Sequence, residues 1–409
     1  MNLFLISNLG QLYQAQALIR KQGLDNNVLG ILYTNMNTTI YDYLVGNVDK
    51  NLFDEVESVL LPNFPNRYTR KKLTQMRNQY ELLFDKYNFE RVFICSFEGH
   101  YNFIKSIASE RGTRIALFEE GTATYKWLIN EETQELTLKG RLKRALIISK
   151  NDFKKAYNNS FVKVVIDKSL IIQTTKASFK LLKRITAAFI TKKHRTSIQA
   201  SLYPRKVREA FGKITEFDEL YVAFPDKAKD IFKAEKYNEL ISDYELNEES
   251  KLLIEKSTAL KSLTNDSIVF VNQKYKVPND VHVNAILSFF ADNYSEEKIF
   301  IKFHPRDPEV MKEAFARGIV RYNLNVEIID LDIEVPFESI LKVKKPKLVI
   351  GISSTSLIYT KKINPETQTI SCANYYISYL IKKKVNMNVI NLLNYHKKIL
   401  QTLSDIEIK

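Results

Sequence analysis

The chain has 409 residues, of which 45% are hydrophobic and 11% aromatic, so it can bury a core large enough for two domains. This composition excludes a single small domain and a disordered chain. Only two cysteines occur, and no run approaches the roughly 20 apolar residues that a membrane-spanning helix needs. We therefore expect a folded cytoplasmic protein without a disulfide framework, a secretory leader or a membrane span.

The net charge of +14 is concentrated in one part of the chain. Residues 139–213 hold 20 Lys and Arg against three acidic residues, which makes this segment +17 and the remainder of the chain −3. A solvated surface rich in lysine would not explain this asymmetry. The pattern predicts a negatively charged partner, such as phosphate, anionic lipid or an acidic polysaccharide.

In chain order, the first half alternates short apolar runs with longer amphipathic stretches, which is typical of βαβ units in a parallel sheet. The expected strands are residues 2–7, 27–34, 91–97, 113–118 and 219–224, and the expected helices are 9–23 and 102–112. The basic segment, about 130–215, interrupts this series before its last strand. Within it, apolar residues at helical spacing predict either an interfacial helix on anionic lipid or a helix packed on its own domain. The residues of this stripe and its cations are Phe179, Leu182, Ile185, Phe189, Lys180, Lys183, Arg184, Lys192 and Lys193.

The second half repeats the alternation after residue 240. Its expected strands are 266–273, 298–303, 325–330 and 346–352, and its expected helices are 284–294 and 356–362. We therefore predict an α/β protein of GT-B type, with two Rossmann-like domains, 1–240 and 241–409, facing a central cleft. The last helices are expected to return to the first domain. In such sheets ligands bind outside the carboxyl ends of the strands, so chemistry should be sought there.

Two adjacent acids, Glu119 and Glu120, follow the expected strand at 113–118 and precede Gly121. In a cleft, neighbouring carboxylates raise each other's pKa, which favours one of them as a general base near neutral pH. The same residues would also serve as a helix cap or a solvated turn.

A histidine follows the expected strand at 298–303, in the sequence Lys302-Phe303-His304-Pro305-Arg306. The proline ends the strand and fixes the turn. A histidine between cations can donate a proton or a charge-assisted hydrogen bond to a departing phosphate. A surface histidine without such a role is the alternative.

A hydroxyl-rich turn, Ser353-Ser354, stands between the strand at 346–352 and a helix. Free N–H groups at a helix start bind phosphate, and the same residues also cap helices. Glu338 is an acid that can bridge ribose hydroxyls, and Asn272 and Gln273 end a strand with side-chain amides that a nucleotide donor could use.

Together these motifs resemble the E/D-E/D-G, HP and Ser-Ser signatures of sialyltransferases that use CMP-sialic acid, in the same order. The chain is most similar to bacterial capsule polysialyltransferases. The strings that carry this resemblance are NLFLISNLGQLYQAQALI, ILYT, SFEGHY, FEEGTATY, FPDKAKDIF, IFIKFHP and GISSTSLIYT. They cover most of both halves, and the resemblance fails over about residues 130–215.

The resemblance implies an inverting transfer of sialic acid from CMP-sialic acid to the non-reducing end of oligo- or polysialic acid, without a metal or other cofactor. Glu120 would deprotonate the acceptor hydroxyl and His304 would protonate or stabilise the departing phosphate, with Glu119, Gly121 and Pro305 in support. Donor-binding residues would be Lys302, Ser353, Ser354, Glu338, Asn272 and Gln273. Acceptor-binding residues would be His100, Lys180, Lys183, Arg184, Lys192 and Lys193.

The resemblance also implies capsule synthesis at the cytoplasmic face of the inner membrane, with an anionic membrane surface and other capsule proteins as partners. Two alternatives remain open, a sialyltransferase that caps lipooligosaccharide once and a non-catalytic nucleic-acid-binding protein. No nucleic-acid-binding signature is present, so we expect no nucleic-acid partner. The linkage (2,8, 2,9 or alternating), the product length and the oligomeric state are not readable from the sequence.

Overall fold

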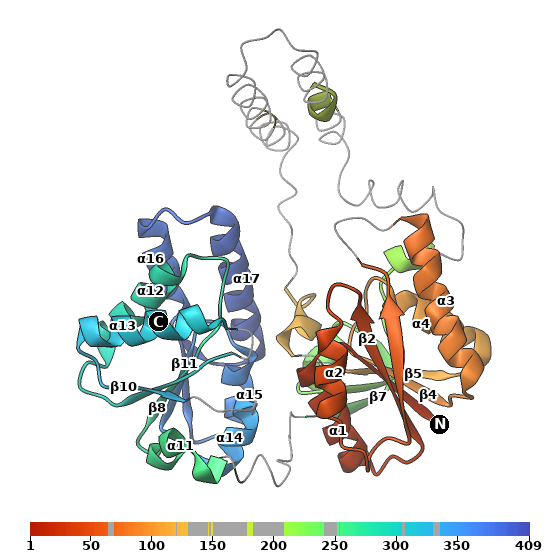
Figure 1. The fold of residues 1–409 in the computed structure, drawn as a ribbon, viewed down its shortest axis with the longest axis horizontal. Coiled ribbons are helices and arrows are strands. Elements are labelled where there is room, and N and C mark those ends of the chain that lie inside the picture. Colours follow the sequence, from red (N-terminus) through yellow and green to blue (C-terminus); the bar gives the residue numbers. More distant parts are fainter. Residues whose placement is uncertain are drawn as a thin grey trace.

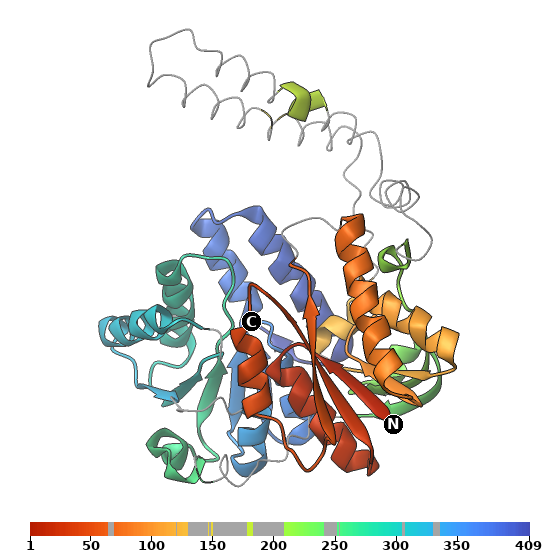
Figure 2. The same ribbon diagram turned by 45° about the vertical axis from the view of Figure 1, so that its right-hand side comes forward.

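The computed structural model describes residues 1–63, 69–119, 121–129, 178–182, 208–240, 254–304, 307–329 and 336–409, and single residues 146, 149 and 252. Two parallel sheets with interleaved helices make up this part of the chain. Figures 1 and 2 show the two sheets side by side, each carrying helices on its faces.

The first sheet has the strand order β3-β2-β1-β4-β5-β6-β7, and every neighbouring pair runs parallel. This is the doubly wound order of a Rossmann fold with one added edge strand. Its strands are β1 (Asn2–Ile6), β2 (Asn27–Thr34), β3 (Glu55–Leu61), β4 (Arg91–Ile94), β5 (Arg114–Phe118), β6 (Glu216–Val222) and β7 (Lys233–Glu239).

The helices of this half begin and end where local signals favour it. Asn8 caps α1 by accepting a hydrogen bond from the Gln11 N–H, and Gly23 ends the helix in the left-handed conformation with φ 58°. The helices are α1 (Leu9–Gln22), α2 (Thr39–Gly46), α3 (Arg70–Lys86), α4 (Tyr101–Arg111) and α9 (Pro225–Lys229), with 3₁₀ turns η1 (Thr122–Tyr125) and η2 (Glu209–Phe211).

The second sheet has the order β10-β9-β8-β11-β12-β13, again with all neighbours parallel. Its strands are β8 (Ile268–Val271), β9 (Ile299–Lys302), β10 (Val326–Ile329), β11 (Leu348–Gly351), β12 (Gln368–Ser371) and β13 (Glu407–Ile408). The helices are α11 (Thr258–Ser262), α12 (Asn279–Asn293), α13 (Glu309–Tyr322), α14 (Phe337–Val343), α15 (Thr355–Ile363), α16 (Ala373–Lys382) and α17 (Met387–Leu403).

Two Rossmann-type sheets in series confirm the predicted α/β fold of GT-B type. Strands β3, β7, β12 and β13 were not predicted. Three of them, β3, β7 and β13, are edge strands and β12 lies next to an edge, and their sequences carry charged or polar residues in place of a continuous apolar run. Such residues are tolerated at a sheet edge, where one side of the strand has no paired neighbour.

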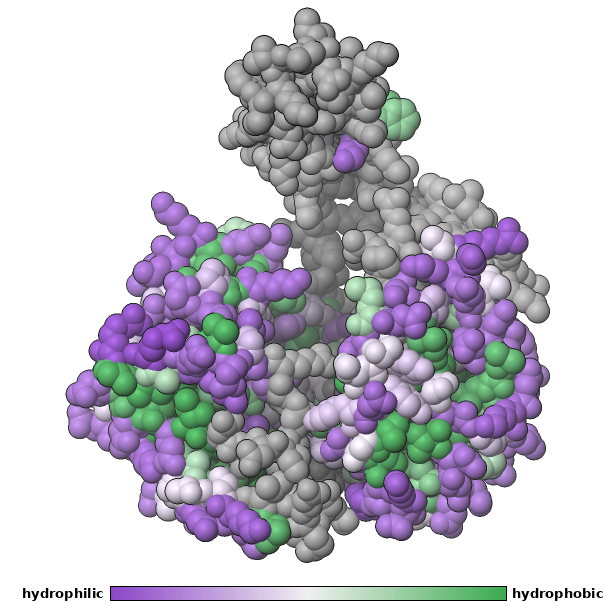
Figure 3. Space-filling model, viewed as in Figure 1, coloured by the Kyte–Doolittle hydropathy of each residue, from purple (hydrophilic) through white to green (hydrophobic). Residues whose placement is uncertain are grey.

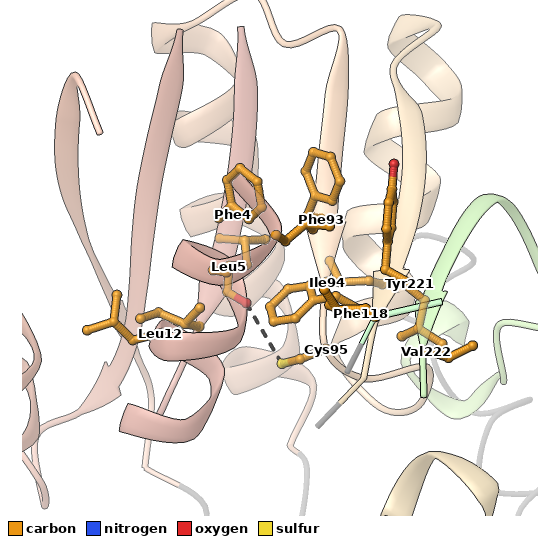
Figure 4. Packing of buried hydrophobic residues seen from close by; sticks show 14 of the residues in the cluster. Phe4, Leu5, Leu12, Phe93, Ile94, Cys95, Phe118, Tyr221 and Val222 are labelled. Atoms are coloured by element: carbon orange, nitrogen blue, oxygen red, sulfur yellow. Dashed lines mark hydrogen bonds between the residues drawn. The ribbon is translucent and has the colours of Figure 1, made fainter. Parts of the chain in front are cut away.

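The central strands are buried on both faces, which is why they read as continuous apolar runs. Phe4 of β1 stacks on Phe93 of β4, with ring centroids 4.3 Å apart and an angle of 3° between the rings. Figure 4 shows these rings beside Phe118 of β5, and beneath them the Cys95 thiol near the Leu5 carbonyl oxygen. Aromatic side chains thus join three neighbouring strands of the first sheet.

The hydrophobic core of the first half continues into the second half. Leu357 and Ile358 of α15, and Ile399, Leu400 and Leu403 of α17, belong to the same buried cluster as the first sheet. The Tyr395 hydroxyl on α17 also donates to the Lys126 carbonyl oxygen at 3.0 Å. Helices α15 and α17 therefore pack against both halves.

The visible surface is largely hydrophilic, with apolar side chains in separate patches on both halves (Figure 3). Among the described residues, no helix has the length and apolar character that crossing a membrane requires. In the basic segment, Phe179 is 73% exposed and Leu182 59%. Lys180 is exposed beside them, whereas Lys183, Arg184, Lys192 and Lys193 lie outside the described residues.

Candidate active site

A cavity of about 820 Å³ lies between the two halves. Its walls come from the segments that follow β1 and β2 in the first sheet, and from the ends of β8, β9 and β11 and the start of α14 in the second. β1 with β4, and β8 with β11, are the pairs at which the strand order of each sheet reverses. Ligands of open α/β sheets bind at such switch points. The cavity lies at the β8–β11 switch point of the second sheet, and in the first sheet its lining follows β1 and β2.

The first-half wall is formed by the start of α1 and the region around α2. It consists of Asn8, Leu9, Gly10, Tyr13, Asn37, Thr39, Ile40 and Tyr43. None of these residues was predicted from the sequence. The sequence did offer a signal for this wall, since the helix-capping Asn8 and the nearby Gly10 directly follow the first buried strand. The first βα turn of such a fold is a common ligand site.

The second-half wall brings together six residues that the sequence had singled out from separate motifs. They are Asn272, Gln273, Lys302, His304, Glu338 and Ser354. Three strand ends and the start of one helix converge there, because parallel strands place all their carboxyl ends at the same edge of a sheet. The loop that carries His304 (the histidine loop) and the turn that carries Ser354 (the serine turn) therefore line the same cavity.

Asp307 holds the histidine loop in place. Its carboxylate oxygen Oδ2 accepts the His304 backbone N–H at 3.0 Å and the Asn272 side-chain amide at 2.6 Å. Behind it, the buried His282 lies with Nε2 2.9 Å from Asn272 Oδ1 and Nδ1 2.7 Å from the Tyr376 hydroxyl. Burial lowers the pKa of His282 to about 4, so this ring is neutral at pH 7.

The His304 side chain is exposed at the cavity, while Pro305 lies outside the described residues. The Lys302 ammonium, on the preceding strand, donates to the Phe303 carbonyl oxygen at 3.2 Å. Both Asn272 amide atoms are engaged by protein groups. Asn272 therefore supports the loop, a role that its position after a strand did not reveal.

The two serines of the turn have different surroundings. Ser353 is 5% exposed, and its hydroxyl hydrogen-bonds with the Tyr275 hydroxyl and donates to Gln273 Oε1 at 3.1 Å. The Tyr275 hydroxyl lies 3.3 Å from Nδ1 of His396 on α17. Ser354 caps α15 and lines the cavity. Only the second serine is therefore presented to a ligand.

Glu338 stands at the start of α14 and accepts a hydrogen bond from the Ser356 hydroxyl at 2.8 Å. Burial raises the pKa of this carboxyl above its usual value. Ser356 lies in the first turn of α15 and also lines the cavity. Glu338 thus connects the starts of two helices at the second-half wall.

The acidic loop follows β5. Glu119 is 1% exposed, and its carboxylate accepts the Tyr125 hydroxyl at 2.5 Å, the Ala223 N–H at 2.6 Å, and the hydroxyl of Tyr359 from α15. Burial raises the pKa of Glu119 to about 7, and these hydrogen bonds oppose the rise. Glu120 lies outside the described residues.

Gly121 and Thr122 bring the acidic loop against the start of α15. The Thr122 and Thr355 hydroxyls are 3.2 Å apart. Gly121 has φ 118°, and a Cβ there would lie 3.3 Å from Oγ1 of Thr355. The first-half acidic motif and the second-half serine turn, more than 200 residues apart, therefore meet at one helix start.

Two predicted acceptor residues lie away from the cavity lining. His100 precedes α4, with Nδ1 2.7 Å from the Tyr80 hydroxyl, and burial lowers its pKa to about 4. Lys180 lies on the exposed helical segment of residues 178–182, which both ribbon views draw apart from the two sheets (Figures 1 and 2). The resemblance in SFEGHY made His100 an expected acceptor residue, and in the structure its ring faces Tyr80 of α3.

No group of three or more His, Cys, Asp or Glu that could hold a metal ion occurs within the described ranges. We found no significant match to the chain among curated proteins.

Solved structures that are similar over most of the chain share little sequence with it. One is a UDP-glucose: anthocyanidin 3-O-glucosyltransferase in complex with UDP, with 11% identity, a TM-score of 0.49, and coverage of 99% of this chain and 94% of that chain. Another is MurG from Acinetobacter baumannii, with 8% identity, a TM-score of 0.45, and coverage of 100% and 85%. A third is the UDP-GlcNAc 2-epimerase from Neisseria meningitidis bound to UDP-GlcNAc, with 8% identity, a TM-score of 0.47, and coverage of 100% and 95%.

A family model described as alpha-2,8-polysialyltransferase matches residues 2–373, which includes both sheets except β13, and the acidic, histidine and serine motifs. The chain is therefore a glycosyltransferase, and it belongs to the alpha-2,8-polysialyltransferase family.

Proposed function

We propose that this protein transfers sialic acid from CMP-sialic acid to the non-reducing end of an oligo- or polysialic acid, with inversion and without a metal or other cofactor. The observation that carries the proposal is the meeting of Lys302, His304 and Ser354 on one wall of a cavity at the switch point of the second sheet. Such a wall suits a nucleotide phosphate, since it combines a cation, a histidine and a helix start.

The proposed role of each residue follows from the charge that develops on the substrates during transfer. As CMP departs, negative charge grows on its phosphate and the sialyl centre becomes oxocarbenium-like. Lys302 and the first turn of α15 stabilise that charge, and His304 donates to it. From the acceptor, Glu120 takes the proton of the attacking hydroxyl. Its neighbour Glu119 supports the loop.

The family's description favours the α2,8 linkage among those that the sequence left open. We further propose that the product is capsular polysaccharide made at the cytoplasmic face of the inner membrane, where the basic segment binds anionic acceptor, anionic lipid or both. The +17 charge of residues 139–213 supports this proposal, because polysialic acid carries one carboxylate per sugar.

To test this proposal, the purified protein is incubated with CMP-sialic acid and a fluorescent trisialyl acceptor, in the presence of a chelator and without added metal. The products are then resolved by length. A ladder of longer products supports the proposal, and linkage-specific sialidases then identify the bond. Capping of a lactoside without elongation would assign the protein to single addition. No transfer to either acceptor would overturn the donor assignment.

Two variants assign the roles. Glu120→Gln and His304→Ala should each lower transfer at least about a thousandfold while the fold is retained, since each removes a proton-transfer or charge-stabilising group. Glu366→Gln, an exposed acid on the second half, is the matched control and should transfer normally. A near-normal rate in either test variant would remove that residue from the mechanism.

A further inference from the structure

Helix α15 contacts the first half along one side. Thr355, Tyr359 and Lys362 are spaced four and three residues apart, so they lie on the same face of the helix. Thr355 meets Thr122 and Gly121, and Tyr359 meets Glu119. Lys362 pairs with Glu239 and lies over the Phe224 ring at 4.7 Å. Leu357 and Thr360, on the opposite face, are buried as well.

The same helix begins at the cavity. Ser354 caps it, and Ser354, Thr355 and Ser356 line the second-half wall. One rigid element of nine residues therefore carries the proposed phosphate site at its start and the contact with the acidic loop along its side. A shift of α15 would move both together.

Tyr359 makes the link to the acidic loop at Glu119. Two donors to this carboxylate, the Tyr125 hydroxyl and the Ala223 N–H, come from the first half, whereas the Tyr359 hydroxyl comes from the second. The carboxylate is 1% exposed and Tyr359 is 4% exposed, so water does not compete freely for this bond. Glu119 is the chain neighbour of Glu120, the proposed base.

We infer that Tyr359 is a positioning residue, whose hydroxyl ties the Glu119 carboxylate to α15 and so fixes Glu119 relative to the proposed phosphate site at the start of that helix. The inference rests on the proposed function, because it takes the roles of Glu120 and of the α15 start from there. The tie acts on transfer through Glu119, and Tyr359 itself does not line the cavity.

The decisive variant is Tyr359→Phe, which keeps the ring and its packing and removes the hydroxyl. We expect kcat for transfer to fall roughly 10- to 100-fold, the loss typical of one hydrogen bond to a buried charged group. The KM for CMP-sialic acid should change less than about twofold, because the donor wall is intact. Circular dichroism and thermal unfolding establish that the variant is folded.

Two matched controls distinguish the loss of the link between the halves from the loss of any tyrosine hydrogen bond to a carboxylate. Tyr375→Phe removes a hydroxyl that donates to the Asp292 carboxylate at 2.6 Å within the second half, and its kinetics should be normal. Tyr125→Phe removes a hydroxyl from the same Glu119 carboxylate but leaves the link between the halves. It should lower kcat less than Tyr359→Phe does.

A double-mutant cycle tests whether Tyr359 acts through Glu119. If it does, Tyr359→Phe should lower kcat less than about twofold further in a Glu119→Leu background, because leucine has a similar size and no acceptor for the Tyr359 hydroxyl. Additive losses, an equal loss in Tyr125→Phe, or a raised donor KM with unchanged kcat would each overturn the inference while the proposed function stands. A wild-type protein without sialyl transfer would instead overturn the proposed function, and the positioning role with it.

Discussion

Replacing Gly121 with alanine should disturb the contact between the acidic loop and α15. The backbone at Gly121 has φ 118°, which residues with a Cβ rarely adopt, and holding such a conformation costs about 1–3 kcal/mol. The new Cβ would also lie 3.3 Å from Oγ1 and 3.4 Å from Cγ2 of Thr355, closer than most Cβ contacts. The first effect lies in the backbone of the acidic loop, and the second acts between the two halves.

We expect Gly121→Ala to reduce the free energy of unfolding by about 1–3 kcal/mol and the kcat for transfer by at least about tenfold. Urea unfolding measures the first quantity and steady-state transfer the second. Gly23→Ala is the control, since Gly23 has φ 58° with no atom within 4 Å of the added Cβ and ends α1 at the far side from the cavity. It should cost about 1 kcal/mol and leave kcat unchanged.

A second-site variant separates the two causes. Thr355→Ala removes both atoms nearest to the new Cβ, so it should restore part of the activity of Gly121→Ala if the contact matters, compared with Thr355→Ala alone. No recovery would assign the loss to the backbone conformation. Wild-type stability and rate in Gly121→Ala would refute the reasoning, because neither the strain nor the contact would then exist.

Three further predictions concern the hydrogen bonds around the cavity. Asp307→Ala should lower the transfer rate at least about tenfold, because it removes the acceptor that fixes the His304 loop. An unchanged rate in kinetic assays would show that the loop keeps its position without Asp307. Burial raises the Glu119 pKa from 4.5 to about 7, so the native state binds this proton more tightly than the unfolded state does. The resulting stabilisation is fully present below pH 4.5, and about 3 kcal/mol of it is lost as the pH rises through 7. Urea unfolding at pH 5 and pH 8 should therefore show a smaller loss with rising pH in Glu119→Gln, and equal losses would contradict the shift. Ser353→Ala should lower the unfolding free energy by about 1–3 kcal/mol, whereas Ser354→Ala should mainly raise the donor KM, and a reversed result would exchange the two assignments.

Much of the site was visible in the sequence because each motif directly follows a buried strand. Parallel strands carry their carboxyl ends to one edge, so Lys302, His304 and Ser354 could be expected near one another before the structure was known. The roles of Asn272 and Ser353 could not. Their side chains turn toward Asp307 and Tyr275, and no periodic pattern along the chain reports the direction of a single side chain.

The sequence by itself determined the central strands of the two series and the helices predicted beside them, because apolar periodicity and helix caps are local properties that neighbouring residues decide. Only the tertiary structure decided how the two series meet. The contact of Tyr359 with Glu119 joins residues 240 positions apart, and that of Thr122 with Thr355 joins residues 233 apart. Such contacts depend on the packing of two separately formed sheets through α15 and α17, and that packing is set by the shape of buried surfaces that no local pattern encodes.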